Sequence, residues 1–192
     1  MKKLYCIRHG TSLHNVLFHK IGRRAYKEYR DTPLVEAGIR EATELGETWD
    51  KIKEIDLVIV SPLKRTLDTA QHIFKNIDVP FISIDCIMEH PQAEEICNLR
   101  RPKQELEQKY PHINFSLLSD NHKLYWSDVY EPEKEKQRLN ARIDEFKKII
   151  HSRPEKNIAV VSHSSYLGQL LFQKIGDEST ELRHCHPYLL TM

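Results

Sequence analysis

The chain has 192 residues, of which 40% are hydrophobic and 30% are charged, and its formal net charge is +1. A chain of this length can bury one sizeable core, which indicates one domain rather than two. The near-zero net charge argues against nucleic acid and against an anionic membrane as partners, so recognition of an anion must depend on a local basic cluster.

Predicted strands and helices follow one another along the chain. Apolar runs rich in valine and isoleucine predict buried strands, and apolar residues at spacings of three and four predict helices. In chain order the elements are strand 4–7, helix 36–52, strand 56–61, helix 63–74, strand 80–84, helix 135–150, strand 157–162 and helix 165–175. The strands do not alternate strictly with polar residues, which is typical of strands covered on both faces. The pattern predicts a three-layer α/β/α sandwich with a mostly parallel central sheet.

Residues 86–131 do not fit this pattern. The segment contains three prolines, and its helical pattern is confined to about 102–109. We therefore expect a single domain over residues 1–192, in which 86–131 form an elaboration over the edge of the sheet that carries the candidate active site.

Titratable side chains follow each of the predicted strands. Arg8 and His9 come directly after the first strand, and Arg65 follows the second within about one helical turn. Glu89 lies beyond the third strand, and His163 comes directly after the fourth. Because ligands of parallel α/β sheets bind outside the carboxyl ends of the strands, we expect these side chains to lie close together.

These residue types suit the transfer of a phosphoryl group. The planar guanidinium of arginine binds phosphate oxygens through two donors and stays charged. A neutral imidazole can attack phosphorus, and a carboxylic acid can protonate the leaving oxygen. Arginines can offset the charge of the phosphoryl group, so this chemistry implies neither a metal nor a cofactor.

Four segments carry a resemblance to a known family. The stretches "IRHGTSLHN", "DTPLVEAGIREA", "VIVSPLKRTLDTA" and "AVVSHSSYLG" resemble, in order, the sequence blocks of the histidine phosphatase superfamily, the phosphoglycerate mutase-like group. The resemblance implies that His9 is the nucleophile that becomes phosphohistidine. It implies that Arg8, Arg65 and His163 form the phosphate pocket with His9, and that Glu89 is the general acid and then the base.

The same resemblance implies three further substrate contacts, at Thr11, Asn15 and Ser164. Ser164 stands where a glycine usually follows the histidine, and its small side chain is expected to preserve the pocket. We also expect Gly10 to let the backbone turn tightly beside the bound anion, and the second ring nitrogen of His9 to donate to a backbone carbonyl.

The expected function is a metal-independent phosphatase that hydrolyses a phosphomonoester. A phosphoglycerate mutase uses the same pocket, but mutases of this group are typically longer than this chain. A non-catalytic relative that binds a partner usually lacks the nucleophile or an arginine, and here all five core positions are filled. Glu94 and Glu95 lie near Glu89 in sequence and remain alternatives for the acid. The triplet "HCH" at 184–186 is a weak signal for a metal site, because adjacent side chains diverge.

The substrate is expected to be a small phosphorylated molecule. Two basic stretches, 22–30 and 98–103, either extend the anion site toward a polyphosphorylated or nucleotide-like ligand or are solvated surface charge. A homodimer is left open.

The expected location is the cytoplasm. The apolar stretch at 4–7 is too short for a signal peptide, and no run of about 18 apolar residues would span a membrane. The four cysteines are widely spaced and form no CxxC motif, as expected of free thiols in a reducing compartment.

Overall fold

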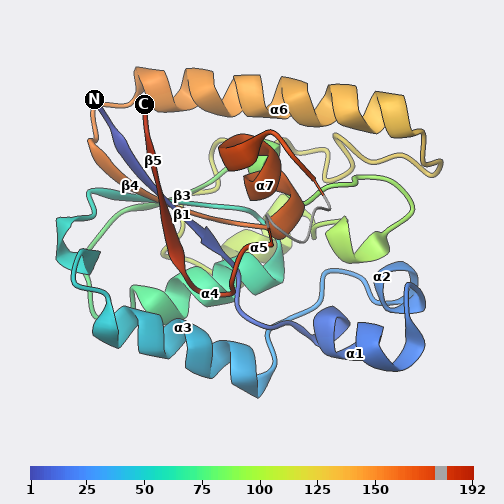
Figure 1. The fold of residues 1–192 in the computed structure, drawn as a ribbon, viewed down its shortest axis with the longest axis horizontal. Coiled ribbons are helices and arrows are strands. Elements are labelled where there is room, and N and C mark those ends of the chain that lie inside the picture. Colours follow the sequence, from blue (N-terminus) through green and yellow to red (C-terminus); the bar gives the residue numbers. More distant parts are fainter. Residues whose placement is uncertain (176–180) are drawn as a thin grey trace.

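The central sheet of the protein has five strands in the order β3-β2-β4-β1-β5. The computed structural model describes residues 1–175 and 181–192 (Figure 1). The strands are β1 (Lys3–Arg8), β2 (Leu57–Val60), β3 (Phe81–Ser83), β4 (Asn157–Ser162) and β5 (Pro187–Thr191). Neighbouring strands are parallel except for β1 and β5, which are antiparallel. The predicted mostly parallel sheet is therefore confirmed.

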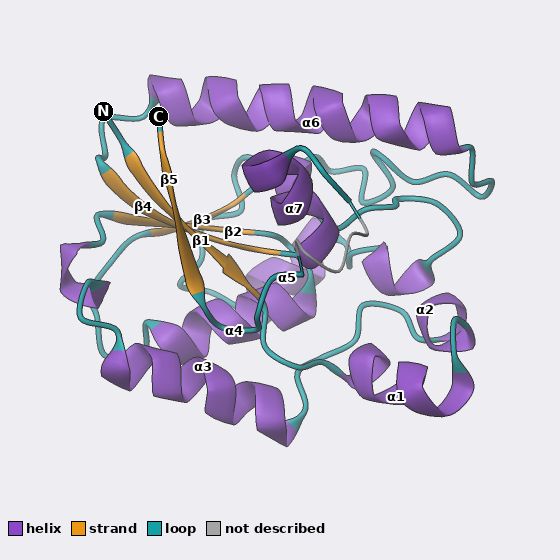
Figure 2. Ribbon diagram, in the orientation of Figure 1, coloured by secondary structure: helices purple, strands orange, loops and turns teal. Residues whose placement is uncertain are grey.

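Helices cover both faces of this sheet. Figures 1 and 2 show α3 (Glu36–Thr48) and α4 (Lys64–Ile73) on one face, and α6 (Pro132–Ser152) and α7 (Ser164–Phe172) on the other. The shorter helices α1 (Leu13–Ile21) and α2 (Arg24–Glu28) lie toward one end of the sandwich, and α5 (Lys103–Lys109) lies beside α4. Single 3₁₀ turns occur at η1 (Ile52–Glu54), η2 (Asp85–Ile87) and η3 (Ile96–Asn98).

Two apolar cores hold the three layers together. Successive side chains of a strand point to opposite faces, so β1 sends Tyr5 and Ile7 into the core under α3 and α4. It sends Leu4 and Cys6 into the core under α6 and α7. The central strands β2 and β4 divide in the same way, which explains why their sequences read as continuous apolar runs. The fold is the predicted α/β/α sandwich.

Two elements were not predicted from the sequence. Strand β5 begins at a proline and lies at the sheet edge, where its side chains are half-buried or exposed, so it lacks the long apolar run of the buried strands. Helix α2 has five residues within a highly charged stretch. Helix α3 ends at Thr48, four residues before the end of the predicted helix, and Ile52 packs from the 3₁₀ turn η1 instead.

The strand register brings the predicted site residues to one edge of the sheet. Arg8, the last residue of β1, lies opposite Ser162, the last residue of β4. Val60 of β2 lies opposite Val161 on the other side of β4. The residues that follow these three strands therefore emerge side by side.

The segment 86–131 consists mostly of loops with η2, η3 and α5. It is joined to the sheet by a bridge between Ile82 and Asn114, and part of it reaches the site described below. Within the described residues, none of the helices combines the length and the apolar character needed to cross a membrane.

Candidate active site

A cavity of about 170 Å³ opens at the carboxyl ends of the strands. Its wall includes Arg8 and His9 from the end of β1, Glu89 and Asn98 from the segment after β3, and Ser164 from the start of α7. Side chains that are more than 70 residues apart in sequence therefore share one small polar cavity, which is the arrangement that the strand-end positions predicted.

His9 is buried, and two contacts fix its tautomer. Its Nδ1 lies 2.7 Å from the carbonyl oxygen of Gly10, to which it donates. Its Nε2 lies 3.2 Å from Nε of Arg65, which can only donate, so Nε2 carries the lone pair. Burial, and then the charge of Arg65, hold the pKa of His9 well below its ordinary value. The imidazole is therefore neutral, as a nucleophile must be, and the expected contact of its second nitrogen with a backbone carbonyl is present.

Arg65 is fully buried beneath His9. Its other two nitrogens donate to the carbonyl of Cys97 and to Oδ1 of Asn98, each at 2.9 Å. None of its three partners is a carboxylate. A buried guanidinium that has only neutral partners retains an uncompensated positive charge, and a bound anion would offset it.

Arg8 and His163 each present a polar atom that lacks a partner. Nη1 of Arg8 donates to the carbonyl of Leu182 at 2.7 Å, whereas its buried Nε has no partner among the described residues. Nε2 of His163 lies 2.7 Å from the hydroxyl of Ser61, whereas its buried Nδ1 is likewise unpartnered within that part of the chain. The ring of His163 lies 5.2 Å from that of His9, centroid to centroid. Unsatisfied buried polar atoms are rare, so these two indicate a site for a hydrogen-bonding ligand.

His163 and Arg65 both lie beside His9, but neither belongs to the wall of the 170 Å³ cavity. Burial, and then the charge of Arg65, lower the pKa of His163 well below its ordinary value. A neutral His163 has one N–H to donate. If the Ser61 hydroxyl donates to Nε2, that N–H is on the unpartnered Nδ1.

Glu89 rests on the N-terminus of α7. Its Oε1 accepts from the backbone N–H groups of His90 at 2.9 Å, Ser165 at 3.1 Å and Tyr166 at 3.2 Å. Burial raises the pKa of Glu89, and this effect outweighs the opposing influence of the His90 hydrogen bond and of Arg65. The shift favours the protonated carboxyl, which is the form that a general acid requires.

The three further predicted substrate contacts are placed differently. Asn15 and Ser164 line the cavity, but Thr11 does not. Oδ1 of Asn15 accepts from the backbone N–H and the hydroxyl of Ser12, which caps α1. Both the backbone N–H and the hydroxyl of Thr11 donate to the carboxylate of Glu41 on α3, at 2.8 Å each. Thr11 therefore anchors the loop to α3.

The close approach of this loop to α3 also explains Gly10. A Cβ atom at Gly10 would lie 2.6 Å from the carbonyl oxygen of Gly38, and one at Gly38 would lie 2.1 Å from that of Thr11. Gly22 is the one glycine with a positive φ among the described residues. Gly10 is therefore required for backbone packing against α3, and it does not need the positive φ that glycine permits.

Three side chains at the site were not found from the sequence. Asn98 binds Arg65 from a loop whose sequence shows no periodicity. His14 packs near His9 and bonds Thr32 at 2.5 Å, and burial lowers its pKa to about 2. Nδ1 of His184 donates to the backbone carbonyl of His9 at 2.5 Å. The "HN" pair that precedes Val16 was a signal for His14, the "HCH" triplet marked His184 only as a weak metal signal, and nothing local marks Asn98.

The "HCH" triplet is divided between two environments. His184 contacts the backbone of His9, whereas His186 is exposed and packs its ring edge against Tyr188, with the ring centroids 4.9 Å apart. The two imidazoles thus serve different neighbours.

The two basic stretches have different surroundings, and the exposed Arg23 and Lys27 of the 22–30 stretch match the expectation of solvated surface charge. Arg100 is fully buried and forms a bidentate ion pair with Asp85, with N–O distances of 2.6 and 3.3 Å. It neither contacts the cavity nor lies in solvent, and it ties the segment 86–131 together. Arg23 and Lys27 lie outside the cavity and are paired with Glu95 and Glu94.

The comparisons with known proteins agree with this geometry. The family model of the histidine phosphatase superfamily (branch 1) matches residues 4–191. "Phosphoglycerate mutase-like protein 1" of Arabidopsis thaliana is 30% identical over 97% of this chain and 74% of its own length. A Schizosaccharomyces pombe protein named "Probable phosphatase" is 28% identical over 91% of this chain and 78% of its own.

A solved structure shows the same fold. The alpha-ribazole phosphatase from Shigella flexneri superposes with a TM-score of 0.64 over 99% of this chain and 90% of that chain, at 22% identity. The match to the family model spans nearly the whole chain and includes every strand that carries a site residue. The chain therefore belongs to the histidine phosphatase superfamily.

Proposed function

We propose that the protein is a phosphatase that hydrolyses phosphomonoesters through a phosphohistidine on His9. The observation that carries the proposal is the state of His9, which is neutral and has its lone pair on Nε2 beside the buried guanidinium of Arg65. Arg8 and Glu89 stand on the wall of the same cavity. Nucleophile, charge compensation and acid are thus within one site.

In the first step, Nε2 of His9 attacks phosphorus and the bond from phosphorus to the ester oxygen breaks. Glu89 gives its proton to that oxygen, so the alcohol leaves neutral. Arg65 must release Nε2 for this attack, because its Nε donates to the same lone pair in the free enzyme. The freed N–H can then donate to a phosphate oxygen.

In the second step, the carboxylate of Glu89 takes a proton from water, whose oxygen attacks phosphorus. The bond from phosphorus to Nε2 breaks, and the electron pair returns to a neutral His9. Arg8, Arg65, Asn15 and His163 are proposed to hold the phosphoryl oxygens through both steps, since guanidinium and N–H donors stabilise the charge of the transition state. These groups suffice without a metal ion.

A mutase reaction is the second candidate, because a relative is named phosphoglycerate mutase-like. In a mutase, a hydroxyl of a second substrate replaces water in the second step. The cavity chemistry is the same for both reactions, so only the acceptor distinguishes them.

The test is hydrolysis of p-nitrophenyl phosphate in the presence of EDTA. We expect turnover to persist with the chelator and to be lost in His9→Ala, and enzyme quenched with alkaline denaturant during turnover to carry label from a radioactive phosphate ester on His9. Loss of activity in EDTA, or label on another side chain, would refute the mechanism. Incubation with phosphoglycerates completes the experiment, since isomerisation without release of phosphate would identify a mutase.

A further inference from the structure

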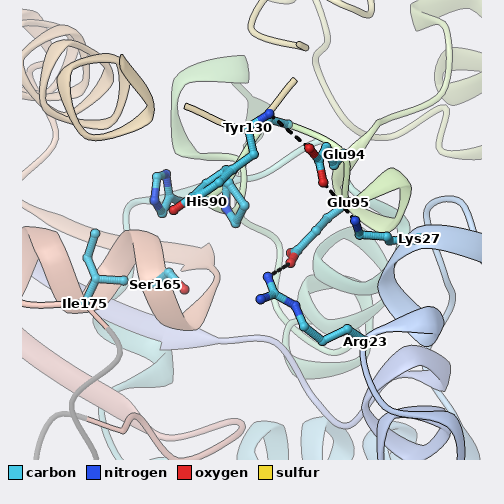
Figure 3. A pocket seen from close by; sticks show the side chains of 10 residues that line it. Arg23, Lys27, His90, Glu94, Glu95, Tyr130, Ser165 and Ile175 are labelled. Carbon is cyan, nitrogen blue, oxygen red and sulfur yellow. Dashed lines mark hydrogen bonds and ion pairs between the residues drawn. The ribbon is translucent and has the colours of Figure 1, made fainter. Parts of the chain in front are cut away.

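A second, larger cavity adjoins the phosphate site. This outer chamber has a volume of about 530 Å³ and shares His90, Glu95 and Ser165 with the wall of the 170 Å³ cavity. Figure 3 shows the side chains that surround it. A phosphate ester held by His9 would extend its organic part into this chamber, because the two cavities meet at these three residues.

The charged groups of the outer chamber are paired with one another. Arg23 lies 3.0 Å from Glu95, and Lys27 lies 2.8 Å from Glu94 (Figure 3). Glu94 also accepts from the backbone N–H of Tyr130 at 3.2 Å, which fixes its carboxylate on the chamber wall. The formal charges of these four side chains sum to zero. His90 adds none at neutral pH, because burial lowers its pKa to about 4.

This balance contrasts with the phosphate site. Arg65, which contacts His9, has no carboxylate among its hydrogen-bond partners, although Glu89 and Glu95 are on the cavity wall. A second phosphate in the outer chamber would have to take Arg23 or Lys27 away from its carboxylate. It would then face Glu94 and Glu95 at close range, and like charges disfavour such a complex. A group without net negative charge meets no such cost, and its hydroxyl groups can donate to the same carboxylates.

We infer that the outer chamber selects monophosphates whose organic part carries no net negative charge, with Glu94 and Glu95 as the specificity-determining residues. The inference rests on the proposed function, because it takes His9 as the point where the phosphate binds. It opposes the sequence-based suggestion that this basic stretch extends the anion site toward a polyphosphorylated ligand.

The test compares inorganic phosphate with pyrophosphate as inhibitors of p-nitrophenyl phosphate hydrolysis. Phosphate occupies the phosphate cavity alone, whereas the second phosphoryl group of pyrophosphate extends toward the outer chamber. The readout is the ratio of the two inhibition constants. In the unaltered protein pyrophosphate should bind no more tightly than phosphate.

Glu94→Gln releases Lys27 and removes one opposing charge, so the ratio should shift toward pyrophosphate by about fivefold, and further in Glu94→Gln/Glu95→Gln. Glu28→Gln is the matched control. It removes the same charge from the same surface and releases Arg24, which pairs with Glu28 at 2.7 Å outside the chamber wall. This control should leave the ratio unchanged.

The inference is overturned if pyrophosphate binds the unaltered protein at least about tenfold more tightly than phosphate. It is also overturned if Glu94→Gln leaves the ratio unchanged, or if Glu28→Gln shifts it equally. Absence of p-nitrophenyl phosphate hydrolysis would instead count against the proposed function. In that case the same ratio is measured by calorimetric titration with phosphate and pyrophosphate, so the two failures remain distinguishable.

Discussion

Two contacts of the His9 imidazole favour the same tautomer, in which Nδ1 carries the proton. The Gly10 carbonyl holds the proton on Nδ1, and Arg65 occupies the lone pair of Nε2 until a ligand arrives. The lowered pKa keeps the imidazole neutral, but it also weakens the nucleophile, because a less basic nitrogen attacks less readily. In the proposed mechanism the nearby guanidinium groups would also offset the charge of the phosphoryl group, which would compensate for the lower basicity of His9.

The titration of Glu89 should shape the pH dependence of the reaction. Its pKa is raised, so the protonated acid persists to a higher pH than for an ordinary glutamate and is lost as the pH rises through the raised value. The pKa of His9 is lowered, so its neutral form persists to a lower pH than usual. We expect kcat/KM to fall on the alkaline side as Glu89 ionises.

Glu89→Gln removes this titration and the proton donor together. We expect kcat for an alkyl phosphate to fall by about 10²–10⁴-fold and the alkaline limb that Glu89 causes to disappear, while binding of inorganic phosphate is retained. The measurements are the pH profile of kcat for the unaltered protein and for Glu89→Gln, and the inhibition constant of phosphate for each. If Glu94→Gln or Glu95→Gln caused the larger loss of kcat, Glu89 would not be the acid.

Helix α6 holds the backbone around Glu89, the proposed general acid. Arg142 on α6 is buried and donates to the carbonyls of Met88 at 2.7 Å and Glu89 at 3.3 Å. Glu135, about two turns earlier on the same helix, accepts from the backbone N–H of Gln92 at 2.8 Å. The backbone on both sides of Glu89 is therefore held by one rigid helix, while its carboxylate is held by α7.

Arg142→Met should weaken general acid catalysis without removing the nucleophile. The substitution leaves the carbonyl of Met88 without its donor, so the loop that carries Glu89 should lose its fixed position. Because an alkoxide leaving group needs protonation more than p-nitrophenolate does, we expect alkyl phosphate turnover to fall by at least about tenfold more than p-nitrophenyl phosphate turnover.

The control for this experiment is Lys136→Gln, which changes an exposed charge on the same helix. It should leave the ratio of the two rates unchanged. Should Arg142→Met fail to fold, Arg142→Lys keeps the charge but loses the two-pronged donor, and the same ratio applies. Equal losses with both substrates would mean that Arg142 has only a structural role.

At this level the sequence predicts the buried elements best. Strands β2 and β4 are recognisable because burial on both faces requires continuous valine and isoleucine. Strand β5 is not, because an edge strand tolerates proline and polar side chains. For the site, the sequence predicted the positions of residues that directly follow a strand. It did not predict Asn98 and His184, because tertiary contacts alone bring them to the site. Lys27 pairs with Glu94, which is 67 residues away in sequence. The sequence of the basic stretch alone therefore could not show that acidic partners balance its charge.

For the whole molecule, buried histidines set the response to acid. At and around the site, burial is the main cause of a lowered pKa in five histidines, namely His9, His14, His90, His163 and His184. The unfolded chain binds protons on these side chains near the ordinary histidine pKa, but the folded chain does not. Their contribution to the free energy of unfolding is therefore full above that pKa and falls as the pH drops below it.

We expect the free energy of unfolding to decrease between about pH 7 and about pH 5, by up to about 1.4 kcal/mol per pH unit for each such histidine. The raised pKa values of Asp31 and Glu89 act in the opposite sense, but they concern two groups against five. Urea unfolding at a series of pH values measures the slope. A midpoint that stayed constant or rose on acidification would contradict the prediction.

The contact of Gly10 with Gly38 has a consequence for how the protein tolerates change. Position 38 lies on a helix that supplies none of the reacting groups, yet a single methyl there would collide with the main chain two residues beyond the nucleophile. An alanine at position 38 would force apart α3 and the loop that follows His9, because a Cβ atom cannot approach a backbone oxygen this closely. Position 38 thus constrains the loop that follows His9 although it contributes no side chain to the cavity.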